Sequence, residues 1–491
     1  MSLSASLLLA LSCTPTRFDL QECETTPECR TAFGLGYTCG AEGLCELEPV
    51  PDRCLTTEPA DLWERPGDYP DVIVIGSLYD HGQDQAELAA VQLPFKQVND
   101  EGGLREQSFA LVSCDYAEDD SYDGLSSDEA AIANAEYLIS QLGVQVILGP
   151  ASSSKVEEVY LATQDELPLI ISSNATSPAL TDLDGTEKSD EDPGTVWRTA
   201  PSDVFQGRII GVDLSLRSVA KVGVIYSDDS YGGSLTAVAM ANFTGVSEQW
   251  AFSSPTGLTE ALVDALADPE IEELLFISSD IDEIIAFLNA AAGASNLNGR
   301  GIFLADGAAD QQLINGTKDE VKDLFPLIRG TRPQVPTGPV YESFSTSYTA
   351  TFSELQPSDS IFTAYAYDAS WLGIYGATWA INKDDEVTGK AAGGGLRRVS
   401  SGEELELRPS SWARAKELLN SGEGFDVVGA SGNLDFDPET EEADSSIEVW
   451  AINPPGTDFV VCLTFDWVDG NPKPAGPQNA ICVPDEEEEA E

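Results

Sequence analysis

Residues 146–181, VILGPASSSKVEEVYLATQDELPLIISSNATSPALT, decide the fold of this chain. Two short apolar runs, at 146–148 and 167–171, have the composition of buried parallel strands. A hydroxyl-rich turn follows each run, at 151–154 and at 172–178. Small ligands bind at the carboxyl ends of strands in an open α/β sheet, where such turns offer hydroxyl and backbone N–H groups. The alternative is ordinary loop chemistry, since Ser, Asn and Pro are common in turns.

Strand-like and helix-like patterns alternate on both sides of this stretch, which is typical of a doubly wound α/β sheet. Further strands are expected at 71–76, 109–112, 222–226, 273–277 and 301–304. Helices are expected at 83–99, 127–142, 203–217, 231–243, 258–266, 281–291, 340–352, 361–381 and 411–419. An acidic, glycine-rich loop is expected at 384–395. With 491 residues, the chain should form two or more lobes.

The chain is extremely acidic. It has 85 Asp and Glu residues against 25 Lys and Arg, a formal net charge of −60. This charge argues against nucleic acid or an anionic membrane surface as a partner, because both would repel the protein. We expect most of the carboxylates to form a solvated coat, and attraction of a cationic ligand is the alternative. The acidic run at 485–491 is expected to be disordered.

The N-terminus has the features of an export signal. Residues 3–11 form a short Leu-rich apolar stretch that is followed by Ser12 and Cys13. The stretch is too short to span a bilayer and suits a signal peptide. The Ser-Cys pair resembles a lipoprotein processing site, so residues 1–13 are predicted to be the signal segment, with Cys13 lipidated. Ordinary secretion is the alternative, because no Lys or Arg precedes the apolar stretch. We therefore expect an exported protein, in the periplasm or at the cell surface.

Eight further cysteines favour disulfides, since even numbers of cysteines in exported proteins usually pair. They are Cys23, Cys29, Cys39, Cys45, Cys54, Cys114, Cys462 and Cys482. The first four have x5, x9 and x5 gaps in a glycine-containing segment that needs covalent links to hold a shape. Zinc is the alternative, but x5 gaps are wide for a structural zinc site and no histidine is nearby. Cys462 is expected to pair with Cys482, and Cys54 with Cys114 by elimination. Residues 14–54 thus form a cysteine-rich module, and the Pro- and acid-rich residues 55–70 a linker.

Several motifs, in order, resemble the type I periplasmic solute-binding proteins, specifically the branched-chain amino acid (Leu/Ile/Val) binding family of ABC transporters. The resemblance covers roughly residues 71–455. The motifs that carry it are IGSL at 75–78, DEGGL at 100–104, LGP at 148–150, SNATSPALT at 173–181, WRTAPSD at 197–203, VIYSDDSYG at 224–232, AYAYDA at 364–369 and the turn at 429–438.

The resemblance implies two doubly wound lobes that are joined by a three-strand hinge and close on a ligand. Residues 71–197 and 308–430 would form lobe 1, residues 198–307 and 431–465 lobe 2, and residues 466–491 a C-terminal extension with the acidic tail. The implied function is capture of a small polar ligand, an amino acid or a related amide or acid, for an ABC permease. The alternative is a ligand-sensing or surface-interaction lipoprotein with the same fold.

The resemblance also assigns ligand-binding residues in the first lobe. Ser153 matches a hydroxyl that holds the ligand carboxylate. Thr176 matches a residue whose N–H and hydroxyl bridge carboxylate and ammonium, with the carbonyl of Asn174 as a second acceptor. Tyr79 falls where the first loop often contributes an aromatic ring. Its neighbour His81, the single histidine, is expected in an exposed loop.

Two further residues match the opposite lobe. Tyr231 matches a tyrosine that covers the ligand, with packing at a helix N-terminus as the alternative. Asp306 matches an aspartate that pairs with an α-ammonium group, and capping of the next turn is its alternative. The loop at 253–257 departs from the family, because it lacks the acidic residue that leucine-type members often carry there. The ammonium clamp would then rest on Asp306, or the ligand would not be an α-amino acid.

No catalytic constellation is recognisable in the sequence. A single histidine makes a His-based triad unconvincing and excludes metal sites that need two or three histidines. The glycines at 393–395 lack the Lys-Ser/Thr of a phosphate-binding loop. We therefore expect a binding protein with no enzymatic activity, no metal and no cofactor.

Overall fold

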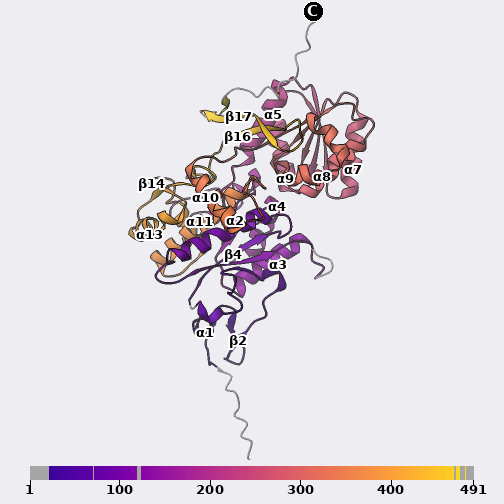
Figure 1. Cartoon of the computed structure of the whole chain (residues 1–491). Helices are drawn as coiled ribbons and strands as arrows, with labels where there is room; N and C mark the ends of the chain where they lie inside the picture. The colour runs from indigo at the N-terminus through magenta and orange to yellow at the C-terminus, as the bar shows by residue number, and fades with distance from the viewer. Residues whose placement is uncertain (1–20, 70, 119–122, 469–470, 476–481, 483–491) are drawn as a thin grey trace, which may run out of the picture.

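Two α/β lobes and a small N-terminal module make up this computed structural model (Figure 1), which describes residues 21–69, 71–118, 123–468, 471–475 and 482. The predicted signal segment with Cys13 and the acidic tail at 485–491 lie outside the described residues. Among the described residues, no helix has both the length and the apolar content needed to cross a bilayer.

The first lobe is built on a six-stranded sheet with the order β3-β5-β4-β6-β7-β8. Five strands run parallel, and β3 is antiparallel to β5. The strands are β3 (Thr56–Glu58), β4 (Ile73–Tyr79), β5 (Phe109–Asp115), β6 (Val146–Leu148), β7 (Leu169–Ser172) and β8 (Val196–Arg198). As predicted, the apolar runs at 146–148 and 167–171 form neighbouring buried strands.

Helices cover both faces of this sheet. One face packs on α3 (Ser127–Ser140) and α4 (Ser153–Thr163). The other face packs on α2 (Gln85–Asp100), α10 (Pro339–Thr351), α11 (Thr363–Asp384), α12 (Gly389–Leu396) and α13 (Trp412–Ser421). Every residue of α11 from Thr363 to Ile381 is buried, because the helix lies between the sheet and the outer helices. A helix buried on all sides needs apolar residues all round, which its sequence provides.

The second lobe is built on an eight-stranded sheet with the order β10-β9-β11-β12-β13-β16-β17-β18. Its strands are β9 (Lys221–Ser227), β10 (Val246–Phe252), β11 (Glu273–Ile277), β12 (Gly301–Leu304), β13 (Ile328–Pro333), β16 (Ile447–Ile452), β17 (Phe459–Val468) and β18 (Asn471–Ala475). Helices α5 (Asp203–Leu216) and α6 (Ser230–Ala241) pack on one face. Helices α7 (Pro255–Ala267), α8 (Ile281–Gly293) and α9 (Gln311–Gly316) pack on the other.

Three chain crossings join the two lobes. They run from β8 to α5, from β13 to α10, and from β15 (Phe425–Val428), which pairs with β14 (Glu403–Glu406), to β16. The predicted fold class, two doubly wound lobes with a three-strand hinge behind a cysteine-rich module, is confirmed.

The predicted boundaries need four corrections. Strand β13 belongs to the second sheet, although 308–430 was assigned to lobe 1. Strands β17 and β18 extend that sheet past residue 465, and β3 places part of the supposed linker 55–70 in the first sheet. Residues 389–395 of the expected loop lie in α12 (Gly389–Leu396), whose glycines permit close packing. A Cβ on Gly395 would lie 2.8 Å from the Cβ of Trp379.

The arginines of β13 explain why its sequence did not indicate a strand. Arg329 is half-buried and Arg332 is buried, and both pair with carboxylates of the second lobe. Arg329 contacts Asp213 at 2.9 Å, and Arg332 contacts Glu448 at 3.3 Å. A buried charge is tolerated when it is paired in this way, so the apolar pattern of a strand is not needed.

The cysteine-rich module contains α1 (Thr26–Phe33), β1 (Tyr37–Cys39) and β2 (Cys45–Leu47). Two disulfides, Cys23–Cys39 and Cys29–Cys45, link its elements. Two others, Cys54–Cys114 and Cys462–Cys482, are the pairs that the sequence predicted. The prediction of disulfides is confirmed, and the zinc alternative is wrong because the sulfur atoms it requires are bonded to one another.

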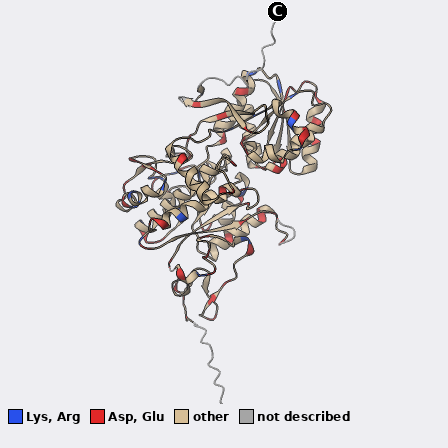
Figure 2. Ribbon diagram, viewed as in Figure 1, with Lys and Arg blue, Asp and Glu red and all other residues tan. Residues whose placement is uncertain are grey.

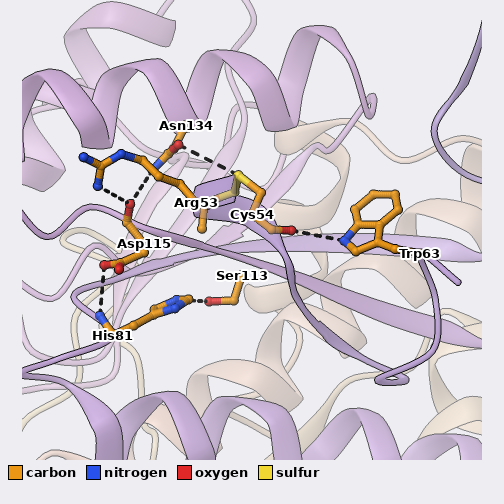
Figure 3. Close-up of a disulfide and its surroundings, with 8 residues drawn as sticks. Arg53, Cys54, Trp63, His81, Ser113, Asp115 and Asn134 are labelled. Carbon is orange, nitrogen blue, oxygen red and sulfur yellow. Dashed lines mark hydrogen bonds between the residues drawn. A yellow bond between two sulfur atoms is a disulfide. The ribbon is translucent and has the colours of Figure 1, made fainter. Parts of the chain in front are cut away.

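The disulfide Cys54–Cys114 fixes the chain that leaves the module to strand β5 (Figure 3). The Arg53 guanidinium donates to Asp123 at 2.7 Å and to the carbonyl of Asp115 at 3.1 Å. The indole of Trp63 donates to the carbonyl of Cys54 at 3.1 Å. Residues 53–63 are therefore part of the first lobe and not a free linker.

The acidic residues are spread over both lobes and the module, with few basic residues among them (Figure 2). This distribution agrees with the expected solvated coat. Because acidic residues are common over the whole surface, a group of them indicates a binding site only where it is buried in a cavity.

Replacing Cys54 and Cys114 together by serine should lower the thermal midpoint of the first lobe. The bond closes a 60-residue separation, which in the loop-entropy model corresponds to about 4 kcal/mol. The matched control is the double serine variant of Cys462 and Cys482. Their disulfide closes a 20-residue separation, so its loss should destabilise the protein by about 1 kcal/mol less than the loss of Cys54–Cys114. Scanning calorimetry measures both. Midpoints equal to wild type for the Cys54/Cys114 variant would contradict this role.

Candidate ligand-binding cleft

A cavity of about 430 Å³ lies between the two lobes. It is lined by residues that follow β4, β6 and β7 of the first sheet and β12 of the second. These are the carboxyl ends of parallel strands, where open α/β sheets bind ligands. Its volume is within the range of pockets that enclose small molecules.

Ser153 lies at the first position of α4, and its side chain lines the cavity. Its hydroxyl accepts a hydrogen bond from the backbone N–H of Ser177 at 3.1 Å, so the turns after β6 and β7 are joined. The first turn of α4 carries no acidic residue. The N–H groups at a helix N-terminus favour an anion, and this end of the cavity therefore suits a carboxylate.

Gly149, just after β6, explains how the chain turns so sharply toward α4. Its φ of +84° lies in the left-handed region, and a Cβ there would be 2.4 Å from the carbonyl oxygen of Leu78. Only glycine fits this position without strain.

Asn174 also lines the cavity, whereas Thr176 and Tyr79 do not. The Asn174 amide donates to Glu87 at 3.3 Å. The hydroxyl of Thr176 donates to Asp203 at 2.8 Å and is thus directed at a buried acid of the crossing into α5. Tyr79 is fully buried, with its hydroxyl 2.9 Å from Ser173 Oγ, so its side chain packs in the core and not along the cavity wall.

Tyr231 and Asp306 line the cavity from the second lobe. The Tyr231 hydroxyl donates to Asp306, which also accepts from the Gln206 amide at 2.9 Å. The same amide donates to Asp203 at 2.6 Å, so it bridges two buried carboxyl groups beside the hinge. Burial raises the pKa of Asp203 and of Asp306, and the charge of Asp306 adds to the shift at Asp203.

Three acids that line the cavity, Asp84, Glu87 and Asp310, were not predicted from the sequence. Glu87, 4% exposed, accepts from Ser360 and Asn174. Asp84 accepts from the Tyr116 hydroxyl at 3.0 Å. Asp310 comes from the second lobe, where it caps α9 by accepting from the N–H of Gln312 at 2.6 Å.

These carboxyl groups are hard to ionise in the absence of a cation. Burial raises the pKa of Glu87, and the charge of Asp310 adds to the shift. Burial raises the pKa of Asp84, and the charge of Glu87 adds to it. Burial raises the pKa of Asp310 to about 6, with contributions from Asp359 and Asp84. Three acids on two lobes therefore share one electrostatic environment.

One signal in the sequence could have identified Asp84 and Glu87. Both follow β4 closely, at the first turn of α2, and so lie at the same sheet edge as Ser153 and Asn174. Nothing distinguished them from the many other acids of the chain, because no motif marks them.

His81 is not in an exposed loop, as the sequence analysis expected. It is partly buried. Its imidazole Nε2 lies 3.0 Å from Ser113 Oγ, and its backbone N–H donates to the Asp115 carboxylate at 3.1 Å (Figure 3). Burial lowers the pKa of its imidazole. The residue supports the loop after β4 and does not line the cavity.

The lobes touch beside the cavity. Ser177 Oγ of the first lobe donates to the carbonyl of Ser230 at 2.9 Å and lies 2.8 Å from Ser234 Oγ, both in the second lobe. On another side, Gln312 Nε2 donates to the carbonyl of Gln83 at 3.4 Å. The two lobes are therefore in direct contact at two places beside the cavity.

The substitution Asp310→Asn should make the stability of the ligand-free protein less dependent on pH. In the folded protein this carboxyl holds a proton up to a pKa of about 6, whereas the unfolded chain releases it near the ordinary value of about 3.9. The stabilisation is complete below about pH 4 and is lost as the pH rises through 6. Asparagine keeps the cap of α9. Between pH 4 and 6 the variant should therefore lose less stability than wild type, by up to about 1.4 kcal/mol per pH unit.

Thermal unfolding at several pH values measures this difference. Glu260→Gln removes an exposed carboxylate from α7 and is the matched control. A curve for Asp310→Asn that runs parallel to wild type would contradict the shift.

Comparison with known proteins agrees with this geometry. The family model described as periplasmic binding protein matches residues 77–403. The chemotactic signal transduction system substrate-binding protein BasB of Halobacterium salinarum is 25% identical over 376 residues, which are 71% of this chain and 77% of that protein.

Solved structures share the fold at low sequence identity. The branched-chain amino acid substrate-binding protein LivJ of Streptococcus pneumoniae, in complex with isoleucine, has a TM-score of 0.58 at 17% identity, covering 80% of this chain and 100% of that chain. The leucine-binding protein LivK of Thermotoga maritima has a TM-score of 0.57 at 15% identity, covering 83% and 99%. A solute-binding protein from R. palustris, in complex with benzoate, has a TM-score of 0.56 at 15% identity, covering 79% and 95%. With its family model matched over 77–403 and its type I fold, this chain belongs to the periplasmic binding proteins.

Proposed function

We propose that this protein captures a small polar ligand, an amino acid, in the cavity between its lobes, without turnover. The observation that supports this most is the polarity of the cavity. Ser153 and the N-terminus of α4 offer hydrogen-bond donors at one end, and the carboxyl group of Asp306 offers an acceptor. A zwitterion needs this pair of opposite ends, all removed from water when the lobes close.

In this proposal, Ser153 binds the ligand carboxylate and Asp306 binds the α-ammonium. Tyr231 orients Asp306 through its hydroxyl, and Asn174 offers a further polar contact. Thr176 acts through its backbone or through Asp203, because its hydroxyl bonds that residue. Tyr79 acts indirectly, by holding Ser173 beside Asn174.

We further propose that the protein is exported, held at the membrane by a lipid on Cys13, and delivers its ligand to an ABC permease. Among the solved structures that share the fold, LivJ is a substrate-binding protein of a branched-chain amino acid transporter, and the R. palustris protein is a solute-binding protein of an ABC transporter. The second candidate function is sensing, in which the liganded form engages a signalling partner. The name of BasB, a substrate-binding protein of a chemotactic system, supports that candidate.

Thermal-shift and calorimetric screens against amino acids, their amides and small aromatic acids test the binding function. A ligand present at about 100 times its Kd should add about 2.7 kcal/mol of stability. Ser153→Ala should weaken binding of that ligand by about ten- to a hundredfold, since a charge-assisted hydrogen bond contributes roughly 1.5–3 kcal/mol.

Ser154→Ala is the matched control, because this neighbouring serine bonds Ser152 at 2.9 Å and does not line the cavity. The control should bind like wild type. Unchanged affinity of Ser153→Ala would move the carboxylate site elsewhere, and no stabilisation by any compound in the screens would contradict the proposed function.

A further inference from the structure

The charge of the cavity lining is strongly one-sided. Eight of its residues carry carboxyl groups, and Lys155 is the only Lys or Arg among the described residues that line it. A neutral amino acid needs one carboxylate for its ammonium group, which Asp306 already offers. The remaining acids are therefore in excess of what a neutral ligand requires.

Lys155 does not neutralise these acids. Its ammonium group lies 3.3 Å from Asp128, on α3, and 5.5 Å from the ring centre of Tyr116. No described Lys or Arg lies within ion-pair distance of Asp84, Glu87 or Asp310. Their partners are the hydroxyl, amide and backbone groups named above, which are uncharged.

The excess acids come from both sides of the cleft. Asp84 and Glu87 lie at the start of α2 in the first lobe, and Asp310 begins α9 in the second. The backbones of Asp310 and Ser360 form an isolated bridge between the lobes, and Ser360 donates to Glu87. Closure thus brings like charges together and removes them from water, which is costly unless a cation lies between them.

Aromatic rings lie in the same cavity. Tyr116, Tyr231 and Phe362 contribute to its lining. The face of an aromatic ring attracts a cation, most strongly where water is excluded. Carboxylates together with aromatic rings form a suitable environment for a guanidinium or alkylammonium group.

We propose that the ligand is a cationic amino acid, whose side-chain charge is held by Glu87, Asp84 and Asp310. This proposal rests on the proposed function, which places the carboxylate at Ser153 and the α-ammonium at Asp306. The side chain then extends toward the start of α2, and its cation joins the acids of the two lobes. Ligand binding and lobe closure are coupled, because one cation contacts acids of both lobes.

Calorimetric titration with L-arginine and L-citrulline tests this proposal directly. The two amino acids have nearly the same shape, and citrulline lacks the side-chain charge. Arginine should bind at least about tenfold more tightly, since at least one charge-assisted contact is lost with citrulline. L-Leucine completes the series as an amino acid with an uncharged, apolar side chain, and a solved structure that shares the fold is a leucine-binding protein.

Variants of the cavity acids identify which carboxyl groups distinguish arginine from citrulline. Glu87→Gln and Asp310→Asn, one in each lobe, should each weaken arginine binding about tenfold or more and change citrulline binding little. Asp282→Asn is the matched control, because this acid lies at the exposed rim of the cavity and its loss should have little effect. Melting curves verify that each variant is folded, and the two variants are independent tests.

The outcomes separate this inference from the proposed function. If citrulline or leucine binds as tightly as arginine, and Ser153→Ala weakens that binding, the cationic ligand is wrong and the amino-acid site stands. If agmatine, which lacks the carboxylate, binds as tightly as arginine, the amino-acid class is overturned. If none of these compounds binds, the cationic amino acid is excluded, and the wider screen decides the proposed function.

Discussion

Acids from both lobes line this cleft, and no Lys or Arg in the part of the chain that the structure describes pairs with Asp84, Glu87 or Asp310. Glu87 and Asp306 are almost fully buried, and each is held by neutral hydrogen-bond donors. Protein interiors tolerate such groups only when they are protonated or when a counter-charge is present. Burial raises the pKa of both groups and so favours their protonated, uncharged forms. A bound cation would replace those protons and connect the lobes at the same time.

The arrangement of the two sheets makes this convergence possible. In each lobe, parallel strands present their carboxyl ends to the cleft, and the segments that follow β4, β6, β7 and β12 line it. These strand ends supply both hydrogen-bond donors and carboxyl groups. The N-terminus of α4 provides donors around Ser153, whereas the starts of α2 and α9 provide acids. The carboxylate and the ammonium of a zwitterion therefore have separate binding positions, and the remaining acids form a third position for a side-chain cation.

Much of this arrangement could be predicted from the sequence, for a physical reason. Strand ends that carry hydroxyl-rich turns must share one edge of a parallel sheet, which places Ser153 and Asn174 together. The motifs around Tyr231 and Asp306 indicated the opposite wall. Tyr79 was misplaced because it is the last residue of β4 and packs into the core, one step before the chain enters the cleft.

Other features could not be predicted because the sequence does not encode them locally. Asp84 and Glu87 look like ordinary acids on an amphipathic helix, and only the tertiary structure shows that they are enclosed. Strand β13 was missed because Arg329 and Arg332 interrupt the apolar pattern, and their partners Asp213 and Glu448 are distant in the chain. In both cases, contacts with residues that are distant in the chain decide what the local pattern leaves open.

A crystal structure of the protein grown with L-arginine tests the central claim most directly. The account predicts ligand density in the cleft, with the carboxylate bonded to Ser153 Oγ and the guanidinium about 2.7–2.9 Å from carboxylate oxygens of both lobes. Arginine bound with its side chain directed away from Glu87 and Asp310, or bound outside the cleft, would contradict it.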